Sequence, residues 1–106
     1  MAEPSLDLSE IIDLYREDGR RMAAQMRNAL AQWEDIRAGG PAGQEMRKLS
    51  HQLRGSGRTY GFRDVTRLCK AIENIVQKLE NGKLAADDRV RGSLARKVDR
   101  LVDVFV

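Results

Sequence analysis

Residues 49–57 of the chain read Leu49-Ser50-His51-Gln52-Leu53-Arg54-Gly55-Ser56-Gly57 and contain its only histidine. At the α-helical period of about 100° per residue, Met46, Leu49 and Leu53 fall on one side of a helix. His51 falls roughly 165° from the centre of that apolar cluster. We therefore expect a helix that is anchored by its apolar face and presents the imidazole of His51 to water.

Cationic side chains surround His51 at the spacings at which residues of one helix are neighbours. Arg47 and Lys48 lie one turn before His51. Arg54 and Gly55 lie one turn after it, and Arg58 lies two turns after it. Imidazole is a nucleophile whose charge changes easily near neutral pH. Neighbouring cations would stabilise a phosphoryl group on it and attract an acidic partner. Gly55 leaves an opening on the helix surface, so the pattern predicts a site that carries an anion.

Four amphipathic helices are predicted, over residues of about 7–36, 44–59, 63–81 and 87–105. Asp7 and Glu10 form the pattern of a capping box at the first helix, and Asp87 favours the start of the last. The glycine- and proline-rich residues 38–43 separate the first two helices. Short connections favour an all-α, antiparallel up-down four-helix bundle with His51 on the second helix.

Length and composition are consistent with one domain that covers residues 1–106. No apolar run is long enough to cross a bilayer, and the N-terminus lacks a signal-peptide pattern. The single cysteine, Cys69, lies on an apolar helix face, where we expect it to be a buried packing residue in a cytoplasmic protein. The net charge of +3 keeps nucleic acid binding open, but the carboxylates nearly balance the cations.

The run from His51 to Ser56, followed by Gly61, Leu68-Cys69 and Ile72-Glu73, resembles the histidine-containing phosphotransfer (HPt) domain of two-component phosphorelays. The pattern of that family is His-x-Leu-Lys-Gly-Ser, then a glycine, then a helix with Leu and Leu/Ile-Glu. The resemblance is strongest between Met46 and Leu79, and in length and helix order it extends over the whole chain.

The resemblance implies that His51 accepts a phosphoryl group from the aspartyl phosphate of a receiver domain or from a histidine kinase, including a hybrid kinase. The group then passes to an aspartate of a response regulator. Arg54 would be the phosphate-stabilising cation, Gln52 a polar contact and Gly55 the residue that gives access. The protein would be a carrier without an ATP site, metal or other cofactor of its own, because the magnesium sits in the receiver. The predicted docking residues are Gln44, Arg47, Lys48, Gly55 and Arg58.

Two departures from the family pattern lie beside the histidine. Arg54 stands where lysine is usual, and a planar guanidinium is not equivalent to the point charge of an ammonium. Arg58 occupies a position that is often small, where it either adds a docking cation or restricts the choice of partner. Glu73, at the Leu/Ile-Glu position, either pairs with a basic residue or is a surface carboxylate.

Two other functions remain open at this stage. The chain could be a helical bundle that docks on receivers or kinases without accepting phosphate, or, more distantly, a basic module that binds nucleic acid. We expect a free-standing protein, because Met1 precedes the first helix by only a few residues. We also expect a monomer, although the sequence leaves the oligomeric state open. The apolar residues 101–106 pack either within the bundle or against another chain.

Overall fold

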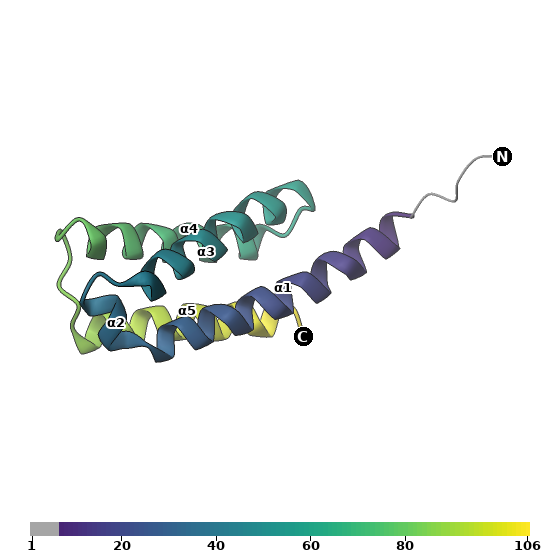
Figure 1. Cartoon of the computed structure of the whole chain (residues 1–106). Coiled ribbons are helices and arrows are strands. Elements are labelled where there is room, and N and C mark those ends of the chain that lie inside the picture. The colour runs from purple at the N-terminus through teal and green to yellow at the C-terminus, as the bar shows by residue number, and fades with distance from the viewer. Residues whose placement is uncertain (1–6) are drawn as a thin grey trace.

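The computed structural model describes residues 7–106, and all the regular structure in that part of the chain is helical. The helices are α1 (Leu8–Ala31), α2 (Trp33–Arg37), α3 (Pro41–Thr59), α4 (Arg63–Glu80) and α5 (Asp88–Val104). The long helices contact one another in the ring order α1, α3, α4, α5. Successive long helices run in opposite directions along the bundle (Figure 1). The all-α prediction is confirmed, and residues 1–6 of the predicted domain lie outside the described residues.

Side chains cap the first and last helices as the sequence predicts. The N–H of Glu10 donates a hydrogen bond to Oδ1 of Asp7 at 2.8 Å. At the start of α5, the N–H of Val90 donates to Oδ1 of Asp87 at 2.9 Å. Each carboxylate satisfies an amide that has no partner within its own helix and also interacts favourably with the helix dipole.

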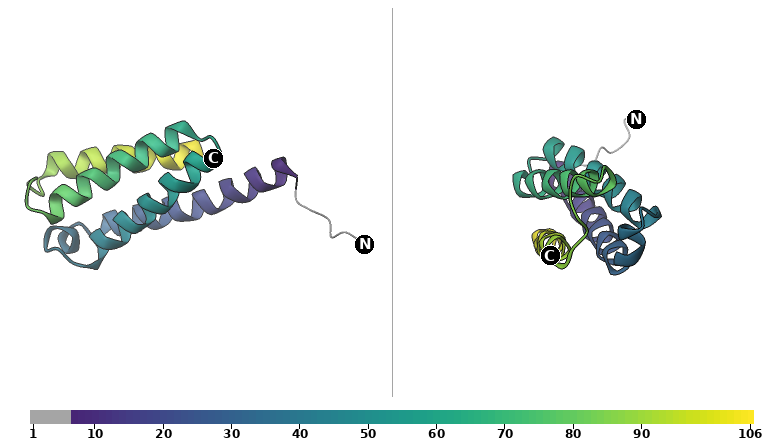
Figure 2. Two further views of the ribbon diagram at one scale, coloured as in Figure 1. Left: turned by 90° about the horizontal axis from the view of Figure 1, so that it is seen from above. Right: turned by 90° about the vertical axis from the view of Figure 1, so that its left-hand side faces the viewer.

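The prediction of one helix over residues 7–36 is wrong, because α1 ends at Ala31 and the short helix α2 follows it. Gln32 breaks the helix with φ −93° and ψ 48°. The break turns the chain so that Oδ2 of Asp35 accepts a hydrogen bond from the N–H of Ala42 at 2.8 Å. The described residues therefore form five helices, where the sequence predicts four, and Asp35 of α2 caps the start of α3. Figure 2 shows the chain turning at one end of the bundle between α1 and α3.

The helix that carries His51 also begins earlier than the predicted residue 44. Pro41 is its first residue, and Gly40 is its N-cap in an extended conformation. Proline suits this position because its fixed φ is helical and its missing N–H would have no partner there. Ala42 and Gly43 are buried, so this first turn belongs to the core of the bundle. The predicted bounds of α4 and α5 lie within one residue of the observed bounds.

In the C-terminal segment, Leu101 and Phe105 are buried in the bundle, whereas Val106 is exposed. Phe105 is fully buried, and its ring centroid lies 5.7 Å from that of Tyr15 and 6.3 Å from that of Phe62. Gly19 of α1 provides the space: a Cβ added there would lie 2.5 Å from Cζ of Phe105. The glycine inside the first helix is thus explained by a close helix contact. Beyond this aromatic cluster, the first turns of α1 extend past the other helices (Figure 1).

Alanine substitutions of two helical glycines should change the stability in opposite directions. Gly19→Ala should lower the free energy of unfolding by about 1–3 kcal/mol, because the new methyl group overlaps the ring of Phe105. Gly55→Ala should raise it by about 0.5–1 kcal/mol, because a Cβ at Gly55 meets nothing within 4 Å. Urea denaturation of both variants checks this. Stabilisation by both substitutions would show that helix propensity, and not packing, governs Gly19.

Candidate functional site

His51 lies on the exposed face of α3, as its helical position predicts. Its side chain is 63% exposed. The opposite face is anchored in the core, where Met46, Leu49 and Leu53 are 0%, 5% and 1% exposed. The helix therefore holds the imidazole at the surface on a rigid base, within reach of another protein.

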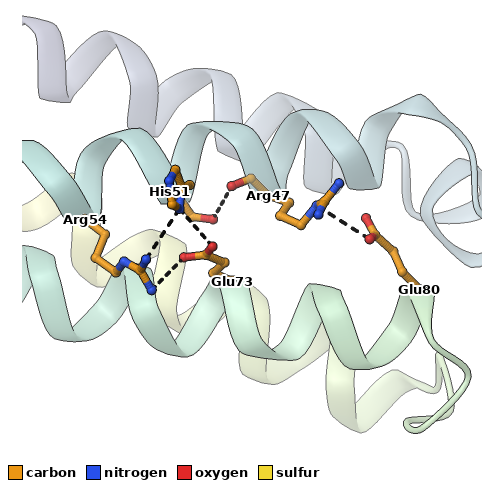
Figure 3. Close-up of polar contacts among 6 residues, drawn as sticks. Arg47, His51, Arg54, Glu73 and Glu80 are labelled. Carbon is orange, nitrogen blue, oxygen red and sulfur yellow. Dashed lines mark hydrogen bonds and ion pairs between the residues drawn. The ribbon is translucent and has the colours of Figure 1, made fainter.

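A buried carboxylate from the neighbouring helix fixes the imidazole. Nδ1 of His51 lies 3.0 Å from Oε1 of Glu73 on α4, and Glu73 is only 7% exposed (Figure 3). An ionised carboxylate can only accept hydrogen bonds, so the geometry assigns the donated proton to Nδ1. In that tautomer Nε2 keeps its lone pair. The nucleophilic nitrogen is thus the one that does not face Glu73.

Arg54 binds the same carboxylate. Its Nη1 lies 3.0 Å from Oε2 of Glu73, and its Nη2 lies 3.5 Å from Nδ1 of His51. A guanidinium and a protonated Nδ1 are both donors, so Arg54 and His51 do not form a hydrogen bond with each other. The attractive interaction of Arg54 is its ion pair with Glu73. Arg54 therefore compensates the buried charge of Glu73, whose other oxygen contacts Nδ1 of His51.

Glu73, which contacts both His51 and Arg54, is absent from the predicted site residues. Two alternatives were open for this carboxylate. The prediction that it pairs with a basic residue is confirmed, and the prediction that it lies at the surface is wrong. The signal was present in the sequence, because Glu73 falls between Cys69 and Val76 on the apolar face of its helix. A carboxylate at such a position requires a partner, since an unpaired buried charge is costly.

A groove between α3 and α4, with a volume of about 450 Å³, opens beside His51. It gathers five of the predicted residues and two residues of α4. The lining residues are Gln44, Arg47, Lys48, His51, Gln52, Glu73 and Gln77. The predicted residues Arg54, Gly55 and Arg58 do not line it, and Arg58 lies exposed nearly two turns beyond His51 on α3. His51 thus borders a groove that contains cationic and amide side chains.

Three further observations on residues 7–106 concern metal ligands, membrane-spanning helices and the single cysteine. These residues contain no group of three or more His, Cys, Asp or Glu side chains that could hold a metal ion. No helix among them is both long and apolar enough to span a membrane. Burial raises the pKa of the Cys69 thiol to about 12, and the side chain is fully buried, so the packing role predicted for it is confirmed.

A helical bundle that presents one oriented, exposed histidine among cations has the features of a histidine phosphotransfer module. The sequence matches the family described as Hpt domain over residues 10–104. The chain therefore belongs to the Hpt domain family, as the motif around His51 predicts. Members of this family take part in phosphotransfer in two-component signalling.

Two curated relatives are similar to the chain. They are the Chemotaxis protein CheA of Listeria monocytogenes serovar 1/2a and that of Listeria innocua serovar 6a. Each is 26% identical over 82 residues, which cover 77% of this chain and 13% of the relative. The chain thus spans a small part of the length of these relatives. No solved structure matches it.

Proposed function

We propose that the protein is a phosphorelay intermediate that carries a phosphoryl group on Nε2 of His51. It accepts the group from the aspartyl phosphate of a receiver domain or from a histidine kinase and passes it to an aspartate of a response regulator. The observation that supports this most strongly is the 3.0 Å contact between Nδ1 and the buried Glu73. In a neutral ring that donates from Nδ1 to Glu73, Nε2 has a free lone pair, and the side chain is 63% exposed.

The transfer step follows from this tautomer. The lone pair of Nε2 attacks the phosphorus of the aspartyl phosphate, and the N–P bond forms. The bond between phosphorus and the aspartate oxygen breaks, and its electron pair leaves with the carboxylate. No proton has to leave Nε2, so the ring gains positive charge while Nδ1 keeps its hydrogen. That charge develops beside Glu73, which is positioned to stabilise it.

The surface around His51 suits a receiver domain. Gly55 has open space where a Cβ would lie, so a partner can approach within one turn of the imidazole. On the other side of α3, Gln52 also borders an apolar groove shared with α1, in which Leu14 is 50% exposed. The predicted docking cations Arg47, Lys48 and Arg58 would attract the acidic active site of a receiver. We take a cytoplasmic monomer as the form that acts, with the magnesium bound by the receiver.

Incubation with a phosphorylated receiver domain tests the proposal. The protein should acquire a label that is labile in acid and stable in alkali, as a phosphoramidate is, and should return it to an unphosphorylated receiver. Saturable binding without any label would instead support the alternative of a docking or inhibitor module. Binding in that case should also survive the substitution His51→Ala.

Removing the carboxylate that orients the ring should slow the transfer. Glu73→Ala should lower the rate of phosphoryl acceptance by about 10- to 100-fold, by analogy with carboxylates that orient metal-binding imidazoles. Glu73→Gln should lower it less, because its amide oxygen can still accept from Nδ1. Rapid-quench labelling by a phosphorylated receiver measures both rates. Equal rates for Glu73→Ala and the unsubstituted protein would show that Glu73 does not orient His51.

A further inference from the structure

The cations around His51 fall on two sides of α3. Arg47 and Arg54 lie on the side that faces α4, and each is paired with a carboxylate of that helix. Nε of Arg47 lies 3.5 Å from Oε2 of Glu80, and Nη1 of Arg54 lies 3.0 Å from Oε2 of Glu73 (Figure 3). Both guanidinium groups are therefore engaged before any phosphoryl group arrives.

The ring of His51 is turned so that its two nitrogens serve different sides. Nδ1 faces Glu73 on α4. The bonding directions of the two nitrogens of an imidazole diverge, so the lone pair of Nε2 points away from α4. Helical side chains also lean toward the N-terminus of their helix, which brings the ring over the preceding turn. That turn contains Arg47 and Lys48.

Lys48 is the cation on the side to which Nε2 points. At three residues before His51 it is rotated by about 60° around the helix, away from Arg54 and α4. Its side chain is exposed and lines the same groove as His51. It forms no ion pair with any carboxylate among residues 7–106. Its long, flexible stem allows its ammonium to follow a group that is bound at Nε2.

We propose that Lys48, and not Arg54, is the cation that contacts the phosphoryl group on Nε2 of His51. Arg54 is then a positioning residue that acts through Glu73. This inference rests on the proposed function of His51 as phosphoacceptor. A swing of Arg54 toward the phosphoryl group would leave the buried carboxylate of Glu73 without its cation, which opposes that movement.

Chemical phosphorylation tests the role of Lys48 without a receiver domain. The protein and its Lys48→Gln variant are phosphorylated with phosphoramidate, and the ³¹P resonance of phosphohistidine is titrated with pH. A contacting cation favours the dianionic phosphoryl group, so Lys48→Gln should raise the pKa of that group by about 0.5 unit. Lys48→Arg should restore most of the original pKa.

Arg47→Gln is the matched control, because it removes the same charge from the adjacent position of the same helix. It should raise the phosphoryl pKa by less than about 0.2 unit, since Arg47 is held by Glu80. Arg54→Gln should alter the ¹⁵N shifts of the imidazole in the unphosphorylated protein, which report its tautomer, whereas Lys48→Gln should leave them unchanged.

An unchanged phosphoryl pKa in Lys48→Gln would overturn the inference, as would a larger shift in Arg54→Gln or an equal one in Arg47→Gln. A failure of the proposed function would have a different signature. In that case receivers would fail to label the unsubstituted protein, while the chemically phosphorylated forms would still give these titration curves.

Discussion

A His51→Gln protein is expected to acquire no acid-labile phosphate from a phosphorylated receiver. Glutamine has no nucleophilic nitrogen, because the lone pair of an amide nitrogen is delocalised into its carbonyl group. His51 is the only histidine of the chain, so no second imidazole can replace it. The fold should be unaffected, since the side chain is 63% exposed. Loss of label should therefore be complete while the unfolding midpoint in urea stays nearly the same.

The control for this variant is binding. His51→Gln should still compete with the unsubstituted protein for the receiver, because the helix surface around Gly55 and the cations remain in place. Lys70→Gln, which removes an exposed cation from α4, should be labelled normally. Acid-labile label on His51→Gln would place the phosphoacceptor elsewhere and refute the proposed site.

The exposure of His51 could be predicted from sequence because it depends only on the helical period. The wheel that places Met46, Leu49 and Leu53 in the core also places His51 at the surface, and both are observed. Glu73 could not be assigned to the site in the same way. Periodicity shows which face of a helix is buried, but the residue that lies opposite on another helix depends on how the two helices are packed.

The hydrophobic periodicity could not predict the helix break at Gln32, for a similar reason. The apolar positions of α1 continue in register to Trp33, so periodicity favours one continuous helix. The break is compensated by contacts made elsewhere, among them the hydrogen bond from Ala42 to Asp35, which depend on where α3 begins. Gly19 shows the same limit: propensity marks it as costly, but only the packed structure reveals Phe105 against it.

Truncating the aromatic ring near the C-terminus should cause the largest loss of stability among these predictions. Phe105→Ala should lower the free energy of unfolding by about 3–5 kcal/mol, because it empties a fully buried site between α1 and the start of α4. A domain of this size has a free energy of unfolding of only about 5–15 kcal/mol. The substitution should therefore remove a large part of the stability and lower the temperature of the unfolding transition. Urea denaturation followed by circular dichroism gives the change directly.

Val106→Ala is the matched control, since this neighbouring apolar residue is 87% exposed and should change the stability by less than about 0.5 kcal/mol. The ring of Phe105 packs on Tyr15 and Gly19 of α1, whereas His51 lies on α3 and its partner Glu73 on α4. The folded fraction of Phe105→Ala should therefore still accept phosphate at low temperature. A loss of labelling without a loss of stability would contradict this, because it would show that the aromatic cluster acts on the phosphoacceptor and not on the fold.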